Sequence, residues 1–225
     1  MAEEKNKPEM NVEDALTQSE AFIIKNKNAI IGSVVAVVII VAGFMLYKNF
    51  ISEPREQKAA AALFKGEQYF GNDQYELALN GDSTGFAGFI KVADEFSSTA
   101  SGELAKAYAG ICYAQLGKWQ EAIKYLEGFD GEDQMVRPAV LGALGDCYAN
   151  LEQLDKATSA FMNAAAKADN NTLSPVFLKK AAEIYEKQGN YAKAVEAYTQ
   201  IKEKYFNSYQ AMDIDKYIDR ANAKK

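Results

Sequence analysis

The sequence predicts an all-α protein in which one apolar helix near the N-terminus is followed by a solenoid of helical hairpins. Three observations support this fold class. A short residue pattern recurs around Tyr113, Tyr148 and Tyr185, at steps of 35 and 37 residues. Residues 29–47 carry no charged side chain. No segment shows the alternation of apolar and polar side chains that is typical of a half-buried strand.

Each copy of the pattern places small and large residues at fixed distances from its tyrosine. A small residue lies three positions before it, an alanine nine positions after it, and a large apolar residue four positions beyond the alanine. In chain order these residues are Gly110, Ala122 and Leu126, then Gly145, Ala157 and Phe161, then Ala182, Ala194 and Tyr198. Residues three or four apart share a helix face, so each copy predicts two helices in close contact.

The steps are close to the 34-residue period of the tetratricopeptide repeat, which the pattern resembles. We therefore expect a tetratricopeptide-type helical-hairpin solenoid over 52–225, with repeats at 103–136, 138–170 and 175–208. The middle copy fits the consensus best, whereas the first has Lys106 where a large apolar residue is usual. An amphipathic helical bundle with coincidental spacing is the alternative. Proteins built from such repeats bind other proteins more often than they catalyse reactions.

Both ends of the array are expected to be capped, as solenoids require. Residues 55–99 predict a degenerate helix pair, with a long polar break at 71–84 between its two helices. Residues 211–223 predict a final capping helix. Ser174 followed by Pro175 reads as a helix N-cap with proline in the first turn.

The uncharged segment 29–47 is expected to be a transmembrane helix, since its nineteen residues would extend roughly 28 Å. An acidic tail, 1–28, precedes it, which favours a retained anchor over a cleaved signal peptide. Lysines and arginines flank the segment on both sides, so the positive-inside rule leaves its orientation open. Gly32, Ala36 and Gly43 lie roughly on one face and are candidates for a helix–helix contact in the membrane. The alternative is that small residues are simply common in such helices.

The residue content argues against an enzyme. There is no histidine, which excludes a histidine-based triad and a histidine-ligated metal. No glycine-rich phosphate loop is present, and we expect no catalytic, cofactor-binding or metal-binding residues. Cys112 and Cys147 occupy equivalent places in successive repeats, too far apart for a disulfide, and are expected to be reduced core residues. The mildly acidic balance after residue 47 argues against nucleic acid as a partner.

In tetratricopeptide arrays the first helix of each pair lines a groove. We transfer this groove to the present chain through the repeat register. The candidate residues are the one just after each small residue and those just after each tyrosine, with Lys179 one turn earlier in the third copy. They are Ile111, Ala114 and Gln115, then Asp146, Ala149 and Asn150, then Lys179, Glu183, Glu186 and Lys187. The lysine–asparagine clamp of some relatives is not reproduced. The alternative is that these are ordinary surface residues.

The whole chain resembles bacterial single-span tetratricopeptide proteins and, more distantly, the ancillary subunit of the SecYEG translocon. The resemblance lies in the order of segments and in short motifs at 19–23, 47–50, 78–82, 144–146, 178–181 and 214–218. It implies an inner-membrane protein with a cytoplasmic N-terminus and a periplasmic repeat domain. Its expected partners are translocon subunits, periplasmic chaperones or client polypeptides, besides the lipid around its span. The alternative function is a structural scaffold of a cell-division or cell-wall complex.

Overall fold

The computed structural model describes residues 20–225, and every regular element in that range is helical. The chain divides into two compact units, Met1–Pro54 and Arg55–Lys225, which are described separately. The predicted all-α fold class is confirmed. The predicted acidic tail, 1–28, lies largely outside the described residues, and its described part includes a short helical stretch at 20–25.

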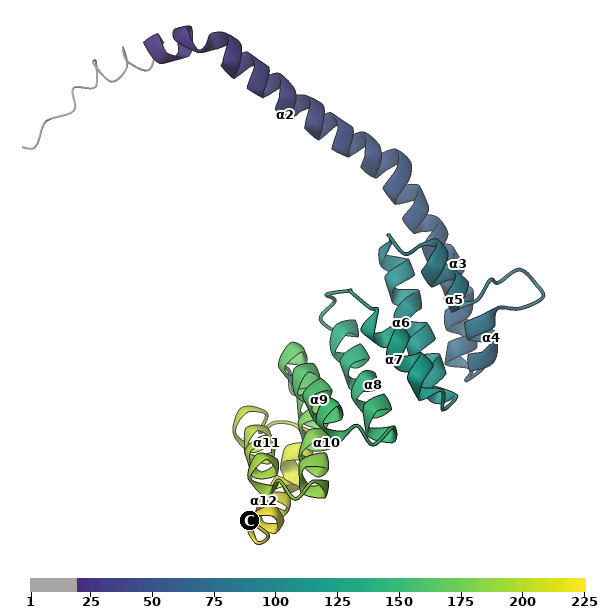
Figure 1. The fold of residues 1–225 in the computed structure, drawn as a ribbon, viewed down its shortest axis with the longest axis vertical. Coiled ribbons are helices and arrows are strands. Elements are labelled where there is room, and N and C mark those ends of the chain that lie inside the picture. The colour runs from purple at the N-terminus through teal and green to yellow at the C-terminus, as the bar shows by residue number, and fades with distance from the viewer. Residues whose placement is uncertain (1–19) are drawn as a thin grey trace, which may run out of the picture. The chain divides into compact units, whose positions relative to one another are not determined.

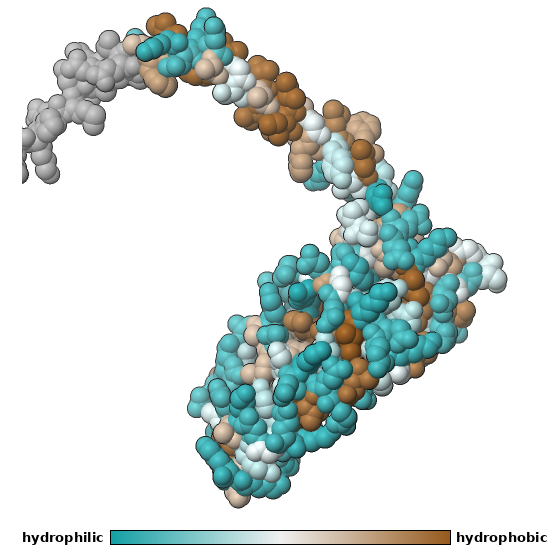
Figure 2. All heavy atoms as spheres, viewed as in Figure 1, coloured by the Kyte–Doolittle hydropathy of each residue, from teal (hydrophilic) through white to brown (hydrophobic). Residues whose placement is uncertain are grey.

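The first unit contains the long apolar helix. Helix α2 spans Lys27–Tyr47 and has no buried residue, and a short π-helix, η1, follows at Lys48–Ser52. Figure 2 shows α2 covered with hydrophobic side chains, whereas hydrophilic side chains dominate the repeat unit. By length and composition this helix could cross a membrane. Apart from its own helix backbone and chain neighbours, no described atom lies within 4 Å of a methyl group added at Gly32 or Gly43, so there is open space beside both glycines.

The second unit is a series of antiparallel helix pairs (Figure 1). Its elements are α3 Glu53–Gly71, which begins just before the unit, α4 Tyr75–Asn80, α5 Phe89–Glu95, α6 Ala100–Gln115, α7 Trp119–Glu127, α8 Val136–Asn150, α9 Leu154–Ala168, α10 Ser174–Lys187, α11 Tyr191–Lys204, the 3-10 helix η2 Tyr209–Asp213 and α12 Ile214–Asn222. Helices α6 and α7, α8 and α9, and α10 and α11 pack as pairs, and each pair also packs on the next. This is the helical-hairpin solenoid that the repeat pattern predicts.

The tyrosine of each repeat marks the same turn between the paired helices. Its carbonyl accepts a hydrogen bond from the amide five residues later, and the residue before that amide has a positive φ. The amides are Lys118, Gln153 and Asn190, at 2.9, 2.9 and 2.8 Å from the oxygens of Tyr113, Tyr148 and Tyr185. The preceding residues, Gly117, Glu152 and Gly189, have φ values of 71°, 56° and 73°. Equal spacing in the sequence therefore corresponds to equal backbone geometry.

The same turn occurs a fourth time, at Tyr69. Its carbonyl accepts from the Gln74 amide at 2.9 Å, and Asp73 has a φ of 57°. Gly66 and Ala78 occupy the small positions three before and nine after this tyrosine. The predicted long break at 71–84 is therefore wrong, because it contains α4 and the turn takes only residues 72–74. What is inserted is a loop at 81–88, which interrupts the second helix of this pair.

Small residues allow the paired helices to approach closely in each repeat. A methyl group at Gly110 would lie 2.6 Å from Leu126, and one at Gly145 would lie 2.7 Å from Phe161. At Gly66 the contacting residue is Phe89. Phe89 follows its glycine by 23 residues, whereas Leu126 and Phe161 follow theirs by 16, and the inserted loop accounts for the difference. The first helix pair is therefore a full repeat with an insertion.

The two cysteines are core residues, as predicted. Cys112 and Cys147 are free and fully buried. Burial raises the pKa of the Cys112 thiol to about 12 and that of Cys147 to about 11, with nearby Asp146 adding to the second shift. Both thiols are therefore protonated near neutral pH.

Two predicted helix boundaries differ from the structure. Ser174 is not an N-cap, because its hydroxyl lies inside α10, where it donates to the Ala165 carbonyl at 2.8 Å and accepts from the Asn170 amide at 3.1 Å. Leu173 precedes the helix without a side-chain cap, and the side-chain oxygen of Asn170 accepts from the amides of Thr172 and Leu173 in the turn before it. The final cap has two elements, η2 and α12, where one helix was expected.

Candidate functional site

The first helices of the repeats expose equivalent residues along one face of the array. We call this surface the first-helix face. It is defined relative to the small residue of each repeat, Gly110 in α6 and Ala182 in α10, and consists of the residues six, three and two positions before it and one position after it. In α6 they are Leu104, Ala107, Tyr108 and Ile111, and in α10 they are Val176, Lys179, Lys180 and Glu183. Each set lines a cleft, which makes this face the candidate binding surface.

The cleft between α6 and α8, which we call the apolar cleft, has no charged side chain in its lining. It is about 200 Å³ in volume, and its other wall consists of Met135, just before α8, and Val136, Ala139 and Val140 at the start of α8. The side chain of Met135 is 62% exposed at its edge. Burial raises the pKa of the lining Tyr108 to about 12, and the nearby Glu67 adds to the shift. An exposed apolar recess of this kind favours a large aliphatic or aromatic side chain.

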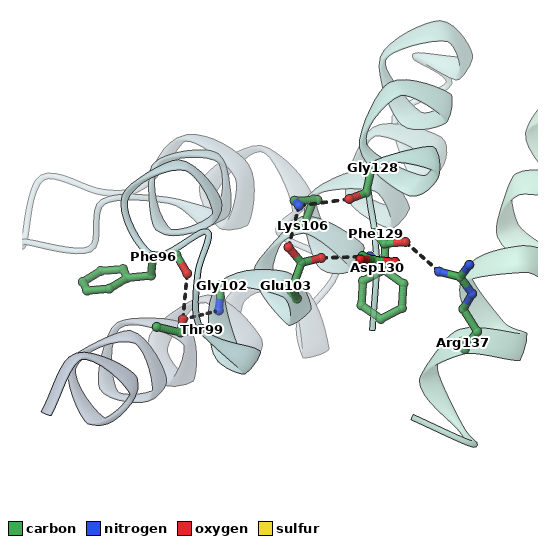
Figure 3. A network of polar contacts seen from close by, with 9 residues as sticks. All are labelled: Phe96, Thr99, Gly102, Glu103, Lys106, Gly128, Phe129, Asp130 and Arg137. Carbon is green, nitrogen blue, oxygen red and sulfur yellow. Dashed lines mark hydrogen bonds and ion pairs between the residues drawn. The ribbon is translucent and has the colours of Figure 1, made fainter. Parts of the chain in front are cut away.

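A polar network fixes the loop beside the apolar cleft (Figure 3). The Lys106 ammonium donates to Glu103 at 2.6 Å and to the Gly128 carbonyl at 2.9 Å, and Glu103 also accepts from the Asp130 amide at 2.9 Å. Arg137 donates to the Phe129 carbonyl at 2.6 Å. Lys106, which departs from the repeat consensus, therefore links α6 to the loop that precedes α8.

The second cleft lies between α10 and η2 and is mixed in character. Its volume is about 410 Å³, and Tyr209, Gln210, Met212 and Asp213 complete its lining. The Lys179 ammonium donates to the Tyr217 hydroxyl at 3.0 Å and lies 4.4 Å from the centre of that ring. This end of the first-helix face is therefore charged, whereas the other end is apolar.

Several predicted groove residues are already paired within the chain. Asp146 accepts from Lys180 at 2.7 Å, and Lys187 lies 2.8 Å from Glu152. These pairs join neighbouring repeats. Glu186 is also engaged, since it accepts from the buried hydroxyl of Tyr198 at 2.9 Å and from Arg220 at 2.7 Å. Its candidacy as a groove residue is therefore not supported by its surroundings.

The remaining predicted residues divide between the clefts and the surface. Ile111 lines the apolar cleft, and Lys179 and Glu183 line the second cleft. Gln115 is exposed at the end of α6, and the Asn150 side chain bonds back to its own helix at 2.9 Å. Sequence reasoning missed Leu104, Tyr108 and Met135. Leu104 and Tyr108 lie seven and three residues before Ile111, so helical periodicity alone could have found them.

No metal cluster is apparent in the part of the chain that the structure describes. Residues 20–225 contain no group of three or more histidine, cysteine or carboxylate side chains placed to hold an ion. The linings of the two clefts described above suit peptide side chains.

Comparison with known proteins agrees with this architecture. Residues 108–129 and 180–208 match the family model of the tetratricopeptide repeat. Similar solved structures include TPR-like repeats of a Podosopora anserina protein described as a kinesin light chain, and a single-residue variant of the same repeats. Each is 16% identical, with a TM-score of 0.54, over 74% of this chain and 86% of the other. No curated protein matches significantly. Two segments of this chain therefore match the tetratricopeptide repeat, and the unit that contains them folds as an all-helical solenoid.

Proposed function

We propose that the chain is a membrane-anchored scaffold that binds other proteins on the first-helix face of its repeats. The observation that carries this proposal is that equivalent positions of α6 and α10 line the two clefts. Because the repeat sets this register, the clefts are features of the array and are not isolated surface irregularities.

The anchor in this proposal is α2. Its apolar side chains are exposed all round, for example Val38 at 60% and Ile40 at 69%, and water would solvate such a surface poorly. A bilayer would remove that cost. The resemblance to bacterial single-span proteins supplies the expected setting, an inner membrane with the N-terminus in the cytoplasm and the repeats in the periplasm.

Within that setting we propose an adaptor that assists protein translocation or periplasmic chaperone traffic. Its partners would be translocon subunits, chaperones or client polypeptides. The alternative is a structural scaffold of a division or cell-wall complex, in which Gly32, Ala36 and Gly43 bring spans together. The identity of the bound protein separates the two roles.

Photo-crosslinking in bacterial cells tests the binding face. Photoreactive residues are placed at Glu183, on the first-helix face, and at Gln115 and Asn150, at the ends of the first helices α6 and α8. Exposed Glu121 and Glu196, on the second helices α7 and α11, serve as controls. The first set should trap discrete proteins that mass spectrometry identifies, and the control set should trap few. Equal trapping from both sets would contradict the proposed binding face.

Protease protection tests the topology separately. The repeat unit should resist added protease in intact cells and be digested once the outer membrane is permeabilised. Digestion that requires lysis of the inner membrane would place the repeats in the cytoplasm and overturn the proposed setting.

A further inference from the structure

The apolar cleft is bordered by carboxylates that make hydrogen bonds to the residues lining it. Glu67, on α3, accepts from the Tyr108 hydroxyl at 3.1 Å. Asp133, in the loop before α8, accepts from the amides of Met135 and Val136 at 2.8 and 2.9 Å. Each of these three donors belongs to a lining residue of the cleft. Two carboxylates are therefore hydrogen-bonded to residues that line an uncharged recess.

Neither carboxylate is paired with a basic side chain in the described part of the chain. Within residues 20–225, neither Glu67 nor Asp133 forms an ion pair with a basic side chain. The hydrogen bonds from the two backbone amides lower the pKa of Asp133, so its carboxylate is charged at neutral pH. Two cations of the neighbouring loop network are engaged elsewhere, because Lys106 is bonded to Glu103 and Arg137 to the Phe129 carbonyl.

The second cleft differs in this respect. Its lining includes Lys180, which is paired with Asp146, and Asp213, which is paired with Lys216. Its charges of both signs give no preference for a partner of one sign. The lining of the apolar cleft carries no charge, and the two unpaired side chains bonded to that lining are both acidic, which favours a basic partner.

We propose that the apolar cleft binds a protein segment in which a large aliphatic or aromatic side chain is flanked by lysine or arginine. The apolar side chain enters between α6 and α8, against Ile111 and under the exposed Met135. The flanking cations face Glu67 and Asp133. This inference rests on the proposed scaffold function and names the chemistry of the partner at one of its clefts.

Fluorescence anisotropy with synthetic peptides tests the proposal on the full chain in phosphatidylcholine nanodiscs. The zwitterionic lipid avoids charge-driven binding of the probes to the bilayer. The probe is a labelled twelve-residue peptide with a central leucine flanked by lysines. Matched peptides carry glutamate in place of lysine, or serine in place of the leucine. The lysine–leucine peptide should bind about tenfold or more tightly than either.

Three variants assign binding to the cleft. Met135→Asp, at an exposed position, should weaken binding of the lysine–leucine peptide by about tenfold or more, and Ile111→Asp should do the same. Glu67→Gln should reduce the preference for lysine over glutamate peptides. As the control, Glu196→Ala, at an exposed position on the second helix α11, should leave the affinity unchanged.

The proposal is overturned if the glutamate peptide binds as well as the lysine peptide, if no peptide binds, or if Met135→Asp binds like the parent chain. The scaffold function is still supported after such a result if crosslinks from Gln115 or Asn150 trap proteins in cells. If those crosslinks fail as well, both proposals fall together.

Discussion

Phe89 packs directly on Gly66, so that a methyl group added at residue 66 would lie 2.3 Å from its ring. Gly145 and Phe161 stand in the same relationship in a later repeat, at 2.7 Å. In both places the small residue comes from the first helix of a pair and the large one from the second. The contact explains why the repeat pattern requires a small residue at this position.

Gly145→Ala is therefore expected to destabilise the array despite the higher helix propensity of alanine. Overpacking against Phe161 should lower the free energy of unfolding by about 1–3 kcal/mol. Urea denaturation followed by circular dichroism measures the change. Gly71→Ala is the matched control, since nothing lies within 4 Å of its added methyl group. If both variants shift the urea midpoint equally, the contact with Phe161 is not what makes residue 145 small, and the steric explanation of the pattern fails.

The turns predict a stabilising substitution. Glu152 has a φ of 56°, a left-handed conformation that Gly117 and Gly189 adopt at the equivalent positions. Glu152→Gly should raise the free energy of unfolding by about 0.5–1 kcal/mol, because the strain of a side chain there exceeds the entropic cost of glycine. Gly189→Ala should lower it by about 1 kcal/mol.

Lys187→Ala is the control for that substitution, since Glu152 also forms an exposed ion pair with Lys187. Exposed pairs contribute roughly 0–1 kcal/mol. Denaturation midpoints of all three variants separate the backbone effect from the loss of the pair. A lower midpoint for Glu152→Gly would contradict the strain argument.

The register of three repeats could be predicted from the sequence because each tyrosine keeps its distance from a small residue and an alanine. The fourth could have been found too, since Gly66, Tyr69 and Ala78 have the same spacing. It was hidden because the loop at 81–88 displaces the large residue to Phe89, and the step from Tyr69 to Tyr113 becomes 44 residues. An insertion inside a helix changes the period without changing the packing.

The candidate site was less predictable than the fold. The repeat register places Asp146 and Lys187 on first helices. It does not show that each forms an ion pair with a neighbouring repeat, Asp146 with Lys180 and Lys187 with Glu152. Which charged side chains form a pair depends on how successive repeats stack, and the spacing within one repeat does not contain that information. The apolar cleft depends on two helices and on the loop that begins α8, so no single copy of the pattern contains it.

The two thiols should be unreactive in the folded chain. Burial raises the pKa of Cys112 to about 12 and of Cys147 to about 11, so both thiols stay protonated at pH 8. A thiol-specific chromogenic reagent should label neither within minutes, and should label both once the chain is denatured. Rapid labelling of either cysteine under native conditions would show that its repeat opens readily.

The buried hydroxyl of Tyr198 should contribute to the stability of the C-terminal repeat. It donates to Glu186 at 2.9 Å, and burial followed by this carboxylate raises the pKa of Tyr198. Tyr198→Phe should lower the free energy of unfolding by about 1–3 kcal/mol, because Glu186 loses a partner in a half-buried site. Tyr209→Phe, at an 80% exposed side chain, is the control and should change little. Equal midpoints for the two variants would argue against this role.

The inserted loop predicts a dependence of stability on pH. Asp82 lies 2.7 Å from the Lys65 ammonium, and it accepts hydrogen bonds from the Tyr69 hydroxyl at 2.5 Å and from the Phe86 amide at 3.0 Å. The contact with Lys65, followed by those with Tyr69 and Phe86, holds the pKa of Asp82 well below its usual range. A carboxyl group with a lowered pKa in the folded state stabilises that state above the pKa of the unfolded chain, and the contribution declines as pH falls below it.

Asp82→Asn should therefore lower the unfolding temperature at pH 7, and by a similar amount down to about pH 5. Between about pH 4 and pH 2 the difference from the parent chain should shrink, because protons bind Asp82 in the unfolded chain first. Thermal unfolding across this range, with the full chain in detergent, measures it. Asp94→Asn is the control, since within the described residues its exposed side chain makes no hydrogen bond or ion pair. A difference between Asp82→Asn and the parent chain that stays constant down to pH 2 would show that the carboxylate charge does not hold the loop.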